Sequence, residues 1–259
     1  MDGLEEKRHK TSCGYTYRCY VSPPSGKDAS KPALLMLHGW PDSARLWSLM
    51  LPSLNELPHR LLVPDMLGYA GTDKPTDPKS YAWSSLTTDL VEILDAEQID
   101  KVIPLGHDWG SAVAQRFYNF HASRTAALVL FNVAYRPPHP PQPFDLDAIN
   151  AQTTQMFGYP LQEYWHLFTA PDGPELFEAN PDRLWEAMHW DDPQCMRKMF
   201  CTPHALREYI TNRHLPKLQL KSYADGTAVQ RHWMNDVKAG DFRVSYLRKQ
   251  TTLLQRRQC

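Results

Sequence analysis

Long apolar runs are missing from this 259-residue sequence, and none reaches the length of a transmembrane helix. The first eight residues, MDGLEEKR, lack the apolar segment of a signal peptide. Neither charge sign is in excess, because 28 Lys and Arg residues face 29 Asp and Glu residues, so no overall field favours nucleic acid or an anionic membrane. We therefore expect a cytoplasmic protein that binds no nucleic acid, while a homodimer stays open.

Metal-site patterns are also missing. The five cysteines are an odd number without the spacings of metal sites, which indicates reduced thiols in a reducing compartment. No internal repeat is present. We expect neither a metal nor a cofactor.

The sequence does contain apolar strands that alternate with helical segments. A hairpin is predicted over residues 8–22, and apolar runs predict buried strands at 32–37, 61–64, 102–105 and 126–131. Helices are predicted at 43–54, 84–98 and 111–118, and Pro52 should kink the first or end it early. This alternation predicts an α/β fold with a mainly parallel sheet, whose ligand lies at the carboxyl ends of the strands.

The segment Gly106–Gly110, Gly-His-Asp-Trp-Gly, lies between a predicted strand and a predicted helix. Glycine two places either side of a reactive side chain is typical of the nucleophile elbow, a strained turn that exposes its central residue. Here that residue is Asp108, and a carboxylate nucleophile attacks saturated carbon and leaves an ester on the enzyme. The alternative is an ordinary turn in which Asp108 caps the following helix.

The strand–helix pattern breaks at residues 136–143, which are rich in proline. Residues 144–240 then read as mostly helical and aromatic, as in a cap that shuts water out of a site. We predict a core over 1–136, a helical cap over 137–240 and the start of a further core segment over 241–259. Recognition of the proline-rich stretch by a signalling domain is the alternative.

Four motifs together resemble a known family. They are His38-Gly-Trp-Pro-Asp42, Asp65-x-x-Gly-Tyr69, Gly106-His-Asp-Trp-Gly-Ser111 and Gly158-Tyr-Pro-Leu-Gln-Glu-Tyr-Trp165. In this order, at predicted strand ends and in the cap, they are similar to the motifs of epoxide hydrolases with the α/β-hydrolase fold. The resemblance covers residues 10–240, and it implies that fold: a mainly parallel sheet with a helical cap.

The resemblance implies a catalytic role for four residues. Asp108 is expected to open the epoxide ring, and the main-chain N–H groups of Trp40 and Trp109 are expected to stabilise the oxyanion when the ester hydrolyses. Tyr164 is expected to protonate the alkoxide leaving the ring. Without the resemblance, both tryptophans and Tyr164 read as core aromatics.

The resemblance also places four residues around the substrate pocket: His38, Pro41, Asp42 and His107. Pro41 is expected to hold its turn through a cis peptide bond. His107 is expected to pack behind the site rather than to act on the substrate. The expected substrate is a small apolar epoxide.

Two departures from the family pattern stand out. Met234 occupies the position where a second cap tyrosine is expected, and Tyr209 or Tyr223 could substitute for it. The family also needs a histidine after the last strand and an acid that orients it. None of the eleven histidines has that position, and Asn132 stands where some relatives carry the acid. We therefore expect the closing C-terminal strands to be absent and the relay to be missing.

Three functions remain open from the sequence. The first is an epoxide hydrolase that is truncated and impaired. The second is a haloalkane dehalogenase, which shares the Asp nucleophile and the following Trp, although dehalogenases usually have Asn or Glu at the position of Trp40. The third is a small-molecule binder without turnover.

Overall fold

A computed structural model describes residues 1–138, 145–240 and 242–243 of the chain. The chain forms two compact units, of which the first contains residues 1–138 and the second contains residues 145–238. Most of the predicted further segment, 241–259, and the proline-rich stretch from residue 139 onward lie outside the described residues. In the described part of the chain, no helix combines the length and the apolar character that crossing a membrane requires.

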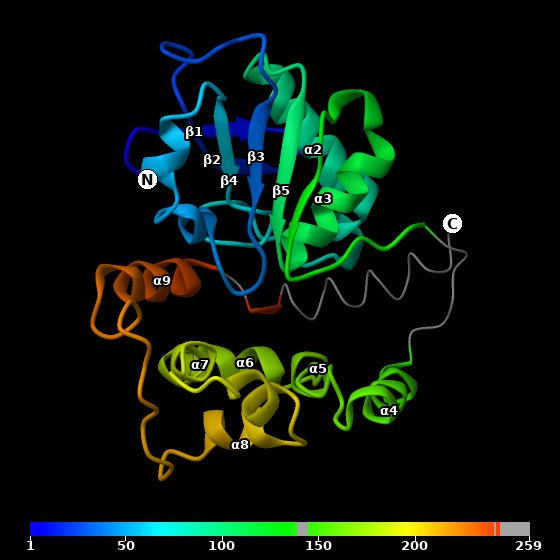
Figure 1. Ribbon diagram of the computed structural model, residues 1–259, viewed down its shortest axis with the longest axis vertical. Helices are drawn as coiled ribbons and strands as arrows, with labels where there is room; N and C mark the ends of the chain where they lie inside the picture. Colours follow the sequence, from blue (N-terminus) through cyan, green and yellow to red (C-terminus); the bar gives the residue numbers. More distant parts are fainter. Residues whose placement is uncertain (139–144, 241, 244–259) are drawn as a thin grey trace. The chain divides into compact units, whose positions relative to one another are not determined.

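The first unit is organised around one sheet of six described strands (Figure 1). The strands are β1 (Glu5–Lys10), β2 (Thr16–Val21), β3 (Ala33–Leu37), β4 (Leu61–Pro64), β5 (Val102–His107) and β6 (Val129–Phe131). Their order is β1-β2-β4-β3-β5-β6; the last four run parallel, and β1 and β2 form an antiparallel hairpin at one edge. The predicted mainly parallel sheet is confirmed.

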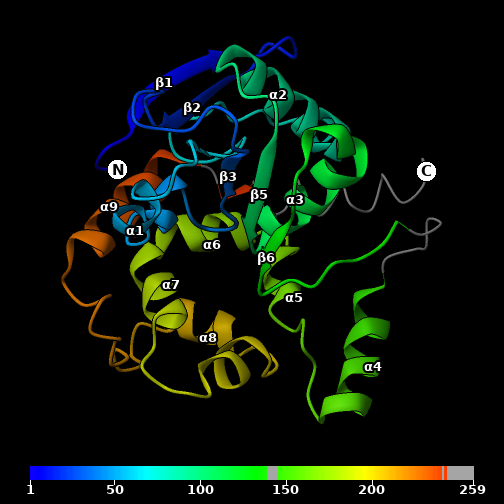
Figure 2. The same ribbon diagram turned by 45° about the horizontal axis from the view of Figure 1, so that its top comes forward.

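Helices cover both faces of this sheet. The helical elements are η1 (Ala44–Trp47), α1 (Leu51–Asn55), η2 (Pro78–Tyr81), α2 (Trp83–Ala96), α3 (Trp109–Phe120) and η3 (Ala122–Arg124). Side chains alternate along β3, so Leu34 and Met36 pack with Trp47 and Leu51 on one face. The helices α2 and α3 lie side by side along the sheet (Figures 1 and 2), and the buried Phe117 belongs to α3.

The predicted helix over 43–54 is wrong in one respect. It is two separate elements, η1 and α1, and Pro52 lies in the first turn of α1. Proline is tolerated there because the first N–H groups of a helix have no partner within it. Pro52 therefore marks where a helix begins. The helix predicted over 84–98 is α2, which begins one residue earlier, at Trp83, and has Ala82 at its cap position.

The predicted buried strand at 126–131 is only partly confirmed. The strand β6 is shorter, and both Val129 and Phe131 are 37% exposed. Among the described strands, β6 pairs with β5 alone and forms an edge of the sheet. The apolar sequence of β6 is typical of a buried strand. Among the described residues, however, β6 has a neighbouring strand on one side only.

The second unit is built from short helices. They are α4 (Leu146–Phe157), α5 (Trp165–Phe168), α6 (Gly173–Ala179), α7 (Pro181–Met188), the π-helical turn η4 (Met196–Phe200), α8 (Ala205–Thr211) and α9 (Ala228–Ala239). Apolar side chains buried within it include Phe177, Leu184 and Trp185. Part of its interior is polar.

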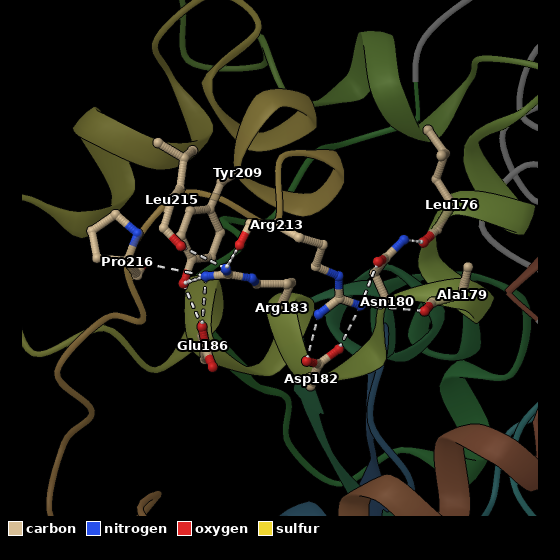
Figure 3. A network of polar contacts seen from close by, with 10 residues as sticks. All are labelled: Leu176, Ala179, Asn180, Asp182, Arg183, Glu186, Tyr209, Arg213, Leu215 and Pro216. Atoms are coloured by element: carbon tan, nitrogen blue, oxygen red, sulfur yellow. Dashed lines mark hydrogen bonds and ion pairs between the residues drawn. The ribbon is translucent and has the colours of Figure 1, made fainter.

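A buried ionic network joins α7 to α8 (Figure 3). The Arg183 guanidinium donates to the Tyr209 hydroxyl at 2.8 Å and to the main-chain carbonyl of Leu215 at 2.6 Å. Tyr209 in turn donates to the Glu186 carboxylate, and all three of these side chains are nearly inaccessible. Burial and this hydrogen bond to Glu186 raise the pKa of Tyr209 to about 12. The network therefore fixes the segment after α8 against α7.

Candidate active site

The nucleophile elbow is formed by the end of β5, Asp108 and the start of α3. The backbone of Asp108 has φ 53° and ψ −123°, a conformation that L residues rarely adopt. A Cβ on Gly106 would lie 2.5 Å from the Gly110 carbonyl oxygen, and a Cβ on Gly110 would lie 2.7 Å from the carbonyl oxygen of His38. Both glycines are therefore required by the close approach of backbone segments.

The Asp108 carboxylate faces the loop that follows β3. The Trp40 main-chain N–H donates to Asp108 Oδ1 at 2.9 Å. A Cβ on Gly39 would lie 2.5 Å from the Asp108 Cβ, so Gly39 leaves the space that the Asp108 side chain occupies. The Asp108 side chain makes no capping hydrogen bond to α3, which disfavours the alternative that it is a helix cap. It is turned instead towards a donor that a developing oxyanion would need.

Two side chains beneath the elbow fix its backbone. The Ser111 hydroxyl donates to the carbonyls of Gly106, at 2.6 Å, and Phe131, at 3.0 Å, and so joins α3 to β5 and β6. The Asn132 side-chain oxygen accepts from the Asp108 main-chain N–H at 3.0 Å. Sequence reasoning treated Asn132 only as a departure from the family pattern, although it directly supports the candidate nucleophile.

His38 lies in the core rather than at an open surface. It is fully buried, and its Nε2 accepts from the Met66 main-chain N–H at 2.9 Å. The proton is therefore on Nδ1, which donates to the Gly39 carbonyl at 2.9 Å. These contacts favour a positioning role for His38, while its predicted place in the substrate pocket stays a prediction. The Trp40–Pro41 peptide bond is cis, as expected.

A buried carboxylate also supports this loop. Asp65 is fully buried and accepts from the Ala44 main-chain N–H at 2.8 Å, just after the loop that carries Trp40. Its charge is paired with Arg18 of β2, whose Nε donates at 2.5 Å. The sequence placed Asp65 at a strand end, but it gave no indication that Arg18 is its partner.

Two further predicted residues are neighbours of Asp108, the first being Asp42 in space and the second His107 in the chain. Asp42 is partly exposed, and the partial burial of its carboxyl, with the Asp108 charge as the second cause, raises the pKa of Asp42 to about 7. Burial lowers the pKa of His107, against an opposing effect of Asp108. Trp109 packs its indole against Trp83, with ring centroids 6.2 Å apart, while its main chain begins α3.

Tyr164 lies in the second unit, immediately before α5. Its N–H donates to the Phe200 carbonyl at 2.9 Å, and its ring makes edge contacts with Phe168 and Phe200. It also lines a cavity of about 190 Å³ that includes Glu163 and His204. Tyr209 is unsuited to be a second hydroxyl donor, because its hydroxyl is buried in the network with Glu186 and Arg183, whereas the alternative Tyr223 is 46% exposed.

The predicted residues therefore fall into two groups. The first unit brings together Asp108, Trp40 and Trp109 at the carboxyl ends of β3 and β5, and Tyr164 belongs to the second unit. A surface cavity of about 460 Å³ in the first unit includes Ala33 and Lys101 at the opposite ends of these strands and so lies away from Asp108. In the described residues, no group of three or more His, Cys, Asp or Glu side chains could hold a metal ion.

Comparisons with known proteins agree with this geometry. Residues 32–160 match the family described as the alpha/beta hydrolase fold. Epoxide hydrolase 3 of Siraitia grosvenorii is 40% identical over 113 residues, which are 44% of this chain and 36% of that protein. Epoxide hydrolase A of Mycobacterium tuberculosis is 34% identical over 106 residues, or 41% of this chain and 33% of that protein. The matches thus span about a third of these curated relatives.

Solved structures extend the likeness to nearly the whole chain. Epoxide hydrolase A from Mycobacterium thermoresistibile has a TM-score of 0.74 at 21% identity, covering 98% of this chain and 77% of that one. An epoxide hydrolase from Vigna radiata has a TM-score of 0.72 at 20% identity, covering 98% and 75%. At these identities the likeness concerns the fold.

Sheet order and elbow are those of the α/β-hydrolase fold, which the structural neighbours share, and residues 32–160 match the model of that family. The chain's curated relatives and its structural neighbours are epoxide hydrolases.

Proposed function

We propose that this chain opens small apolar epoxides through an ester on Asp108. The observation that carries the proposal is the contact of 2.9 Å between the Trp40 main-chain N–H and Asp108 Oδ1, at an elbow where both flanking glycines are sterically required. An N–H group at this place serves a carboxylate that becomes an ester and then a tetrahedral oxyanion. The similarity to Epoxide hydrolase 3 of Siraitia grosvenorii supports an epoxide as the substrate.

In the first half-reaction, an Asp108 oxygen attacks one carbon of the oxirane and the bond between that carbon and the ring oxygen breaks. The ring oxygen becomes an alkoxide, which takes the hydroxyl proton of Tyr164. For this step we propose that the second unit acts as a cap over residues 137–240, in which Tyr164 is the acid. Its aromatic side chains suit an apolar epoxide.

In the second half-reaction, water attacks the carbonyl carbon of the ester, and the diol leaves. The main-chain N–H groups of Trp40 and Trp109 would hold the oxyanion. Within the 259 residues no histidine follows His232. The relay that the family uses to activate water is therefore not supplied by these residues, and we propose that the ester forms faster than it hydrolyses.

The test is intact-mass measurement after exposure to styrene oxide, with parallel quantification of the diol. We expect one equivalent of adduct on the wild-type chain and none on Asp108→Ala. Rapid consumption of about one equivalent of epoxide, followed by slow release of diol, supports slow hydrolysis of the ester. An unchanged adduct in Asp108→Ala would refute the assignment of the nucleophile, and sustained rapid turnover would refute the impairment.

A further inference from the structure

The loop Gly39–Asp42 folds around the nucleophile. Gly39 is in close contact with the Asp108 side chain, and Trp40 donates its N–H to the Asp108 carboxylate. The Asp42 main-chain N–H then donates to the Gly39 carbonyl at 3.2 Å, which closes a turn and returns the chain towards Gly39. The same short loop therefore carries an oxyanion donor and a second carboxyl to Asp108.

The carboxyl of Asp42 is free to exchange a proton with water. Within the described ranges, its oxygens have no hydrogen-bond or ion-pair partner, in contrast to Asp65, whose oxygens are occupied by Arg18 and Ala44. The residue is partly exposed, so water can reach it. An unpaired carboxyl beside a nucleophile costs stability and needs an explanation.

We propose that Asp42 is the general base of the second half-reaction, an inference that rests on the proposed function. Asp42 takes a proton from the water that attacks the ester carbonyl of Asp108, and the Trp40 N–H holds the resulting oxyanion. When the tetrahedral intermediate collapses, the bond to the diol oxygen breaks and this oxygen receives the proton from Asp42. Asp108 is left as a carboxylic acid that carries the second proton of the water. It releases this proton to solvent, and Tyr164 takes one up to replace the proton it gave in the first half-reaction, so protons and charge balance.

The electrostatic interaction between Asp42 and Asp108 is consistent with a base that acts only after the ester has formed. In the free protein, burial and the Asp108 charge hold the pKa of Asp42 at about 7. Ester formation removes the Asp108 charge, so Asp42 loses its proton more readily when a base is required. His107 is a weaker candidate, because burial lowers its pKa and its Nδ1 is enclosed without a partner among the described atoms.

The experiment separates the two half-reactions on the full chain. Wild type, Asp42→Asn and Asp42→Glu are mixed with limiting styrene oxide, stopped with acid and followed by intact mass. We expect Asp42→Asn to form the ester at a rate within about threefold of wild type and to hydrolyse it about 10²–10⁴-fold more slowly. Asp42→Glu should recover part of the hydrolysis rate. The control Asp28→Asn, in an exposed turn at the opposite end of the sheet, should match wild type.

The outcomes are distinguishable. A wild-type chain that forms no ester would overturn both the proposed function and this inference. An ester that decays equally fast in wild type and Asp42→Asn, or no faster in wild type than in urea-unfolded protein, would overturn the inference alone. Equal losses in ester formation and hydrolysis, with a lower melting temperature, would assign Asp42 a structural role and also overturn it.

Discussion

Gly110→Ala should destabilise the first unit, because a Cβ on Gly110 of α3 would clash with the backbone at the end of β3. The new Cβ would lie 2.5 Å from the carbonyl carbon of Leu37, whereas carbon atoms pack at about 3.5–4.0 Å. To remove this clash, the backbones of α3 and β3 would have to separate by about 1 Å. Overpacking of this kind costs about 1–3 kcal/mol, which for a domain of this size is a fall in melting temperature of roughly 2–12 °C.

An opposing effect must be weighed. Alanine is a better helix former than glycine by up to about 1 kcal/mol in a helix interior, and less at the second position of α3. The backbone clash should therefore win. Thermal unfolding followed by circular dichroism measures the net effect, and Thr88→Ala, at an exposed position of α2, isolates the gain in helix propensity. A Gly110→Ala protein as stable as wild type would refute the reasoning.

Three further predictions concern the second unit. Tyr164→Phe should slow ester formation with styrene oxide while leaving the melting temperature almost unchanged, since only one hydroxyl is lost; equal rates of adduct formation by intact mass would exclude this hydroxyl as the acid. Tyr209→Phe should lower the unfolding free energy in urea by about 1–3 kcal/mol, because the buried Glu186 loses a donor, and an unchanged midpoint would contradict this. His189, stacked on Trp185, has its pKa lowered to about 4 by burial, so the unfolded chain binds its proton first. Stability should therefore fall as the pH drops from about 6.5 to 4, and His189→Gln should flatten this slope in urea titrations at several pH values.

The parts of the fold that could be predicted from the sequence are those with a local cause. The glycines at 106 and 110 are set by contacts within one strand–turn–helix, and the apolar run that became β3 is buried on both faces. The family resemblance then predicted that these strands and helices form the α/β-hydrolase fold, and the comparisons confirm that fold.

Long-range partners could not be predicted. Asn132 supports a residue 24 positions earlier, and Arg18 pairs with a carboxylate 47 positions away, so neither pairing leaves a periodic signal. The sequence allows Tyr209 to be a second acid, but in the structure its hydroxyl proton is donated to Glu186. Burial also depends on partners, which is why the apolar β6 could be predicted as a strand but not as an exposed edge.

The ion pair between Arg18 and Asp65 makes the amino-terminal hairpin a structural support of the candidate active site. Asp65 holds the loop after β3, and Arg18 supplies the charge that makes a buried Asp65 tolerable. Shortening the protein from its beginning, a common step in engineering compact enzymes, would leave that carboxylate uncompensated at a cost of about 3–5 kcal/mol. A minimal catalyst derived from this chain would have to retain the hairpin, or replace Asp65 together with its partner.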